Sequence, residues 1–377
     1  MNEFTPIQPQ PSGSEGTLRK SQHLLATKKK PIFPVKGELR DYLTEFNREL
    51  ELPITYKQLL RFRNSVPCYN LDGEDTLWET VGYEIHEMEE INEGLRRIYA
   101  LLKTDGQMDI VQHLYVDRID FCTFGNSNPF RIRIVNSQND NADYFYVKSA
   151  DASRVYGLEL EHLLSPNRMH YLTHGTTLVE EHVVGIPGDI FIANWLQRSE
   201  INPVRMAKEL IKFNERCFIR LLGDMRSYNF VVDITPDIEG FQIRIRCMDF
   251  DQQSYSGRKN FYFPQYFKEN QALALYCLKH LTTESIYQYQ LEEHALMVRR
   301  IHLSRHRLVR LIHAMENDTV STREKVVQLR TALAEHHGYD EFLQCENMGQ
   351  ILHTSLRVMT ERTPKPGDWA NDPKSLL

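Results

Sequence analysis

The stretch from Arg220 to Asp251, RLLGDMRSYNFVVDITPDIEGFQIRIRCMDFD, restricts the fold of this 377-residue chain more than any other. It contains a Gly-Asp turn, an apolar strand, the turn TPDIEG, a second strand and a closing pair of aspartates. A hairpin brings the residues before its first strand close to those after its second strand. Asp224, Asn229 and Asp249 are therefore predicted to place three oxygen ligands at one rim of the hairpin.

Two of these three oxygen ligands suit a magnesium ion. A magnesium ion takes about six hard oxygen ligands, of which only one or two are protein carboxylates and the rest come from phosphates and water. Asn229 and Asp249 are the predicted metal ligands, which leaves Asp224 unliganded. A carboxylate near the metal can accept a hydroxyl proton during phosphoryl transfer. The alternative is a Gly-Asp turn that opens an ordinary hairpin, with acids that only cap loops.

The motif GDMRSYN resembles the catalytic loop of protein kinases and of the aminoglycoside phosphotransferase and choline kinase group, and MDFD is similar to their magnesium-binding motif. Leu222 stands where the family usually has histidine, and Asp251 takes the last position of the protein-kinase Asp-Phe-Gly. An acid there is commoner in the small-molecule kinases. The resemblance therefore implies Asp224 and Arg226 as catalytic residues of a small-molecule kinase, with Arg226 neutralising charge on the transferred phosphoryl group.

Near Val111 the spacing of apolar residues changes from that typical of a helix to that typical of a strand. Three β-rich runs follow, YVDRIDFCTFG, PFRIRIVNS and DYFYVKSA. This meander resembles the opening of a kinase-like N-terminal lobe. The resemblance implies that Lys148 reaches the phosphates of ATP. In the helix SRVYGLELEHLL it implies Glu159 as the partner of Lys148, because the apolar Leu163 follows four residues later. Glu161 is the alternative partner.

Two further segments are assigned to nucleotide binding by the same resemblance. FGNSNP has one glycine, Gly125, where protein kinases have three; backbone amides and the Ser127 hydroxyl are expected to contact phosphate. HYLTHGTTLVEEHVVGIPG resembles the hinge between the two lobes. Backbone groups from Glu181 to Val183 are therefore expected to face adenine, although this segment also fits an ordinary sheet edge.

The ends of the chain are predicted from composition and periodicity. Residues 1–36 are rich in Pro, Gln, Ser, Gly and Lys and lack an apolar period, which favours a disordered tail, and residues 363–377 are predicted to be a flexible tail. Residues 37–108 are predicted to form a helical extension, with one apolar stripe from Trp78 to Leu102. Such a stripe packs either on the following domain or on a protein partner.

The fold class follows from the order of these segments. The resemblance implies an α+β, two-lobed kinase-like fold with a small β-rich N-terminal lobe at 109–184 and a helical C-terminal lobe at 185–362. The helical extension lies outside the resemblance. No protein-kinase activation segment is recognisable after Asp251, which favours a small molecule over a protein as the acceptor.

Composition excludes several classes of protein. The net charge of −6 argues against a general nucleic-acid binder, and the sequence has neither an apolar run of about 18 residues nor an apolar signal core. The six cysteines are far apart and form no paired spacing typical of a zinc site or a disulfide framework. We therefore expect a cytoplasmic protein that binds neither nucleic acid nor membrane.

The sequence leaves three functions open. The first expectation is an ATP- and Mg²⁺-dependent phosphotransferase that phosphorylates a hydroxyl group of a small molecule. A non-catalytic, kinase-like interaction protein is the alternative, favoured by the single glycine of the phosphate loop and by Leu222. A kinase-fold enzyme that modifies proteins, by phosphorylation or by AMP transfer, is the third.

Overall fold

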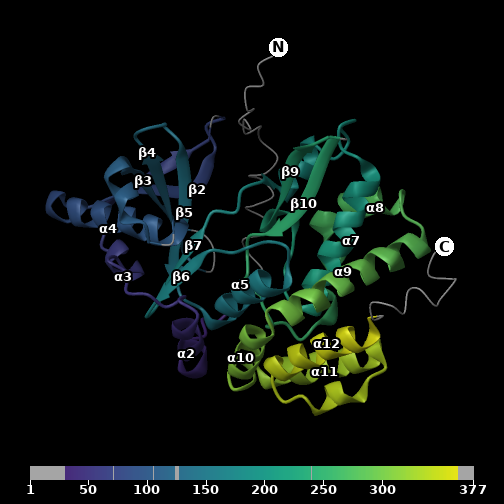
Figure 1. Ribbon diagram of the computed structural model, residues 1–377. Helices are drawn as coiled ribbons and strands as arrows, with labels where there is room; N and C mark the ends of the chain where they lie inside the picture. The colour runs from purple at the N-terminus through teal and green to yellow at the C-terminus, as the bar shows by residue number, and fades with distance from the viewer. Residues whose placement is uncertain (1–29, 71, 105, 124–126, 239, 364–377) are drawn as a thin grey trace. The chain divides into compact units, whose positions relative to one another are not determined.

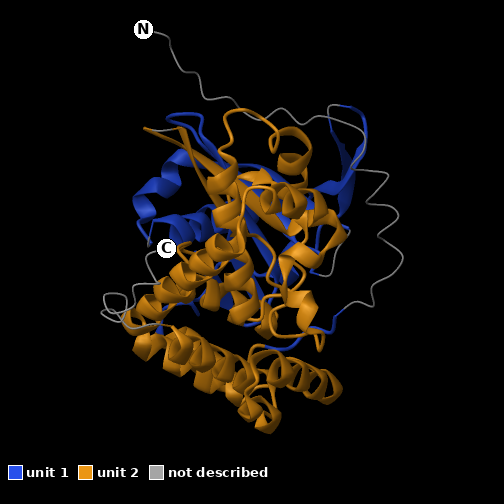
Figure 2. Ribbon diagram, turned by 90° about the vertical axis from the view of Figure 1, so that its right-hand side faces the viewer, with its two compact units in different colours: residues 1–34, 46–150, 170–182 blue, residues 35–45, 151–169, 183–377 orange. Residues whose placement is uncertain are grey.

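The computed structural model describes residues 30–363, except 71, 105, 124–126 and 239, and its chain divides into two compact units (Figures 1 and 2). Unit 1 takes in residues 46–150 and 170–182 with the short piece that ends at Pro34. Unit 2 takes in 35–45, 151–169 and the described chain from Val183 onward. Both helices and strands are abundant, so the fold is of the α+β class. Most of the two predicted tails lies outside the described residues.

Unit 1 is built on one antiparallel sheet of seven strands in the order β1-β2-β3-β4-β5-β7-β6. Its strands are β1 (Asn64–Tyr69), β2 (Asp75–Gly82), β3 (Leu114–Cys122), β4 (Phe130–Asn136), β5 (Ala142–Ser149), β6 (Tyr171–His174) and β7 (Thr177–Glu181). The predicted three-strand meander is confirmed, because β3, β4 and β5 pair in sequence order.

The helices of unit 1 are α3 (Tyr56–Leu59), α4 (Ile85–Lys103) and the 3-10 helix η1 (Met108–His113). Helix α4 packs on β3, β4 and β7. It buries residues spaced three or four apart, Ile91, Leu95, Ile98 and Leu102, in one core with the sheet residues Phe130, Ile132, Phe145 and Val147. The apolar stripe of this helix is therefore covered within its own unit.

The prediction of a wholly helical segment at 37–108 is wrong in its middle, where β1 and β2 form. Trp78, expected on the long helix, lies in β2 and pairs with Cys122 of β3. Thr80 pairs with Asp120, and its hydroxyl donates a hydrogen bond of 2.8 Å to the buried Asp120 carboxylate. Local periodicity misses this strand because the partner strand lies forty residues further along the chain.

Unit 2 combines a three-stranded sheet with helices. Its strands, in the order β10-β9-β8, are β8 (Ile186–Pro187), β9 (Phe230–Asp237) and β10 (Gly240–Cys247). Its helices are α2 (Gly37–Glu45), α5 (Ala152–Leu164), α6 (Gly188–Asn194), α7 (Pro203–Ile219), α8 (Gln271–Leu278), α9 (Thr283–Leu303), α10 (Arg305–Glu316), α11 (Arg323–His337) and α12 (Met348–Arg362). Short 3-10 helices are η2 (Ser227–Asn229), η3 (Lys259–Tyr262), η4 (Pro264–Tyr266), η5 (Lys268–Asn270) and η6 (Asp340–Gln344).

The predicted hairpin is confirmed as β9 and β10, which pair from Phe230↔Cys247 to Asp237↔Gly240. Helix α7, which leads into the hairpin, begins at Pro203, and the Asn202 side chain caps it by accepting hydrogen bonds from two backbone amides.

Helix α2 comes from the start of the described chain but packs against α10, near its end. Arg310 of α10 forms an ion pair of 3.0 Å with Glu45 of α2, and Arg307 donates a hydrogen bond of 3.0 Å to the Tyr42 hydroxyl. None of the helices in the described part of the chain is both long enough and apolar enough to cross a membrane.

Candidate functional site

The loop from Leu221 to Asn229 joins α7 to β9 and carries the predicted Asp224, Arg226 and Asn229. Leu221 and Asp224 have positive φ angles of 55° and 61°, a conformation that costs a residue with a side chain about 1–2 kcal/mol. The Asn229 side chain stabilises the loop, because its Nδ2 donates a hydrogen bond of 2.7 Å to the carbonyl oxygen of Asp224. The two residues predicted from the catalytic-loop motif are therefore in direct contact.

The segment after the hairpin supports this loop. The Gly223 amide donates to the carbonyl of Gln252 (3.3 Å), and the Asp224 amide donates to the carbonyl of Phe261 (3.2 Å). A Cβ atom at position 223 would lie 2.6 Å from Cδ1 of the Phe261 ring. This close approach therefore requires glycine. The left-handed conformation of Asp224 is thus fixed by its neighbours.

The Asp224 carboxylate is held by one arginine. Arg226 Nε donates to Asp224 Oδ1 at 2.7 Å, and the other end of the guanidinium, NH1, pairs at 2.7 Å with Oε1 of Glu269 in η5. Among the described residues, none donates a hydrogen bond to Asp224 Oδ2. This oxygen is available to a hydroxyl group of a substrate.

Burial raises the pKa of Asp224 above its usual range. The Arg226 guanidinium opposes this rise, and the negative charges of Asp249 and Glu269 add to it. A carboxylate with a raised pKa is a stronger base than an ordinary aspartate, which suits proton removal from a hydroxyl. The segment that carries Asp249 meets the loop at its end, because the amide of the preceding residue, Met248, donates to the Asn229 carbonyl at 3.1 Å.

Asp249 and Asp251, which follow β10, share a cation from α5. NH1 of Arg154 lies 2.7 Å from Asp249 Oδ1 and 2.6 Å from Asp251 Oδ1. The Arg154 side chain is only 3% exposed, and the Asp251 amide also donates to Asp249 Oδ1 at 3.0 Å. These contacts fix the Asp249 carboxylate in one orientation. Phe250, between the two acids, is buried beside Gly157 of α5.

Asn229 and Asp249 fit a magnesium ion in the chemistry of their donors. The Asn229 amide group donates through its nitrogen to the loop, so its oxygen is the remaining ligand atom, and Asp249 supplies a carboxylate. Over the described residues no group of three or more His, Cys, Asp or Glu side chains is placed to hold a metal. Magnesium takes only one or two protein carboxylates and obtains its remaining oxygens from phosphate and water.

Lys148 and Glu159 lie in different units, and each has a partner in its own unit. Lys148 Nζ on β5 pairs at 2.8 Å with Oε2 of Glu180 on β7, and both side chains are less than 10% exposed. Glu159 accepts hydrogen bonds from Arg307 (2.7 Å) and from the Tyr42 hydroxyl (2.8 Å). The expected Lys148–Glu159 pair stays a prediction, and the observed partner of Lys148 is Glu180.

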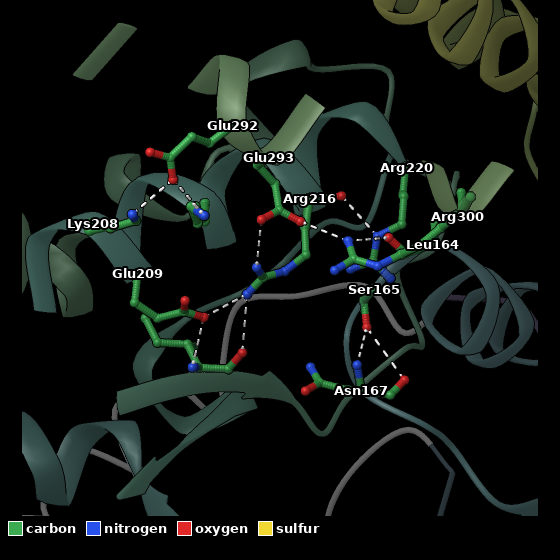
Figure 3. Close-up of polar contacts among 12 residues, drawn as sticks. Leu164, Ser165, Asn167, Lys208, Glu209, Arg216, Arg220, Glu292, Glu293 and Arg300 are labelled. Atoms are coloured by element: carbon green, nitrogen blue, oxygen red, sulfur yellow. Dashed lines mark hydrogen bonds and ion pairs between the residues drawn. The ribbon is translucent and has the colours of Figure 1, made fainter. Parts of the chain in front are cut away.

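The alternative acid, Glu161, belongs to the interior of unit 2. It forms a fully buried ion pair with Arg220 and accepts hydrogen bonds from Ser165 and Asn167. Because the Arg220 guanidinium and these donors outweigh the cost of burial, the pKa of Glu161 is lowered. Arg216, one turn before Arg220, pairs with Glu209 and Glu293 in an adjoining network (Figure 3). Glu161 therefore has a structural role.

The remaining predicted residues are dispersed. Gly125 lies outside the described residues, and Ser127 is half-buried between β3 and β4. Glu181 ends β7, where its carboxylate accepts a hydrogen bond from the His170 amide and pairs with Lys103 at 3.4 Å. The buried Val183 is the first residue of unit 2 after β7, so one division between the units falls within the predicted hinge.

Sequence reasoning missed Arg154, Glu180 and Glu269. Arg154 and Glu180 lie in segments that were already assigned to the site, and the signal that marks them is a charged residue next to apolar ones, since such a charge needs a partner when it is buried. Glu269 lies in an irregular aromatic stretch that carries no periodic signal. No protein-family profile matches this chain, and a search of the curated proteins finds no match.

Proposed function

We propose that the protein is an ATP- and Mg²⁺-dependent phosphotransferase that phosphorylates a hydroxyl group of a small molecule, on a kinase-like fold. The observation that carries the proposal is the arrangement within unit 2 of a hydrogen-bonded Asp224 and Asn229 beside Asp249, with one oxygen of Asp224 available to a substrate. This arrangement supplies a base and two oxygen ligands from one loop and one hairpin.

The proposed reaction needs few steps from the protein. The hydroxyl oxygen of the acceptor attacks the γ-phosphorus of ATP, the bond from that phosphorus to the bridging oxygen of ADP breaks, and Asp224 Oδ2 takes the hydroxyl proton. Arg226 holds Oδ1 and so keeps the carboxylate in place. Asn229 and Asp249 would hold Mg²⁺, which supplies positive charge to the phosphates when bound. We also propose that Arg226 and Lys148 contact the phosphates of ATP.

One contact favours the second candidate, a non-catalytic interaction protein. Arg154 places a buried positive charge between Asp249 and Asp251, where it satisfies carboxylates that a metal would otherwise neutralise. A chain that had lost nucleotide binding would be stabilised by such a contact.

Transfer of AMP to a hydroxyl group is the third candidate. It would use the same residues and would differ in releasing pyrophosphate.

The test separates binding from turnover. Asp249→Asn removes charge from a metal ligand and is expected to weaken Mg²⁺-dependent ATP binding. Asp224→Asn is expected to leave binding largely intact and to lower turnover by about 100- to 10,000-fold, the usual cost of losing a positioned base. Asp237→Asn, on the exposed end of the hairpin, removes the same charge away from the loop and serves as the control.

The measurements are calorimetric titration with ATP, with and without Mg²⁺, and formation of ADP or of pyrophosphate from ATP in the presence of candidate hydroxyl acceptors. Wild-type protein that binds no ATP at millimolar concentration with Mg²⁺ contradicts the enzyme and supports the interaction protein. Binding that neither site substitution alters contradicts the assignment of the site.

A further inference from the structure

The strongest unassigned feature near the loop is the acid that shares Arg226 with Asp224. Arg226 lies between two carboxylates, with Nε on Asp224 and NH1 on Glu269, each at 2.7 Å. All three side chains are between 16% and 27% exposed, so their charges are partly shielded from water. The guanidinium carbon also lies 5.0 Å from the centre of the Phe267 ring.

Glu269 is held in place independently of Arg226. Its neighbour Asn270 is 2% exposed, and Asn270 Nδ2 donates to the carbonyl of Met225 (2.8 Å) and to that of Pro264 (2.7 Å). Residue 270 thus binds the backbone of the loop one position before Arg226. Because that contact is buried, η5 presents Glu269 to Arg226 at a fixed place.

An arginine beside a carboxylate tends to form two parallel hydrogen bonds, one to each oxygen. Arg226 Nε donates to Asp224 Oδ1, but among the described residues no hydrogen bond runs from NH2, the donor parallel to Nε, to Oδ2. The bond from NH1 to Glu269 fixes the orientation of the guanidinium that keeps NH2 from Oδ2. Without this anchor the guanidinium can turn its second donor onto Oδ2, the oxygen that the proposed reaction needs for the proton.

We propose that Glu269 is a positioning residue for the transfer reaction, which keeps Asp224 Oδ2 accessible by holding Arg226 away from it. This inference rests on the proposed function. Glu269 itself touches no reacting atom in this scheme and acts through Arg226. Its effect therefore falls on turnover and leaves the affinity for nucleotide unchanged.

Glu269→Gln tests this role, because glutamine keeps the size and a carbonyl acceptor but loses the charge that anchors Arg226. The probe is Mg-ATP, with water as the acceptor and phosphate release as the readout. We expect release to fall about 10-fold, the dissociation constant for ATP to stay within about 2-fold, and the melting temperature to stay close to that of wild type. Asp237→Asn is the control for loss of one negative charge.

Two further variants make the test specific. In an Arg226→Lys background, lysine cannot form two parallel bonds, so adding Glu269→Gln is expected to have little further effect. Glu269→Asp keeps the charge and is expected to recover part of the lost turnover. Equal turnover in wild type and Glu269→Gln overturns the positioning role and leaves the phosphotransferase standing. Additive losses, or equal losses in the Gln and Asp variants, also overturn it. Wild type that binds no ATP overturns the proposed function and this role together.

Discussion

Replacing His337 by phenylalanine is expected to reduce the acid sensitivity of unit 2. His337 lies in the last turn of α11, where its ring stacks on Phe342, with ring centres 5.4 Å apart, and on Phe218, at 5.8 Å. Its Nε2 is buried and has no hydrogen-bond partner among the described residues. Burial and the nearby positive groups, first among them His336 and then Arg362, lower the pKa of His337 to about 4.

The sign and size of the effect follow from this pKa. An unfolded histidine has a pKa near 6.5, so between about pH 6.5 and pH 4 the unfolded chain binds more protons than the folded one. The stabilising contribution of neutral His337 is therefore complete above pH 6.5 and is lost as the pH falls toward 4. Going from pH 7.5 to pH 5.0 costs about 2 kcal/mol by linkage, and about 1–2 kcal/mol after allowing for solvent around a half-buried ring.

Urea unfolding at pH 7.5 and at pH 5.0 gives the measurement, as the change in unfolding free energy between the two conditions. His337→Phe keeps an aromatic ring between Phe218 and Phe342 but cannot bind a proton, so its change is expected to be smaller than that of wild type by about 1–2 kcal/mol. His302→Phe, at an exposed position of α9, is the matched control. An equal loss of stability in wild type and His337→Phe refutes the reasoning.

Two further substitutions test the interior of unit 2 in the same unfolding assay. Gly349→Ala is expected to destabilise by about 1–3 kcal/mol, because the new methyl group would lie 2.4 Å from the backbone oxygen of Met315; an unchanged urea midpoint would contradict this packing. Arg220→Met is expected to cost about 3–5 kcal/mol, because it leaves the charge of Glu161 buried without its cation. Arg357→Met, which breaks an exposed pair, is expected to cost less than about 1 kcal/mol, and equal costs for the two arginines would contradict the ranking.

The local sequence was sufficient to predict a structural element where the segments that pair with each other lie close along the chain. The meander of β3 to β5 and the β9–β10 hairpin were predictable because short turns join strands that pair with each other. The contact of Asp224 with Asn229 was predictable for the same reason, since five residues separate them. These elements contain most of the candidate site.

Partners that come from neighbouring strands or distant segments were not predictable. Lys148 was assigned an acid from the helix that follows it, but the observed partner is Glu180, two residues beyond the Leu178 that pairs with Lys148 across the sheet. Side chains two residues apart on a strand point to the same face, and this relation depends on strand order. Arg154 and Glu269 likewise meet the loop and the hairpin only through tertiary packing.

The pairing of α2 with α10 has a consequence for synthesis of the chain. Tyr42 is made 265 residues before Arg307, the residue that donates to its hydroxyl. At about 5–20 residues per second, roughly 15 to 50 s pass between the two. During that time every described segment of unit 1 is completed, whereas unit 2 still lacks α10. The contact of α2 with α10 thus forms late, and in a chain halted before Arg307 the part of α2 that meets α10 is a surface on which chaperones and proteases can act.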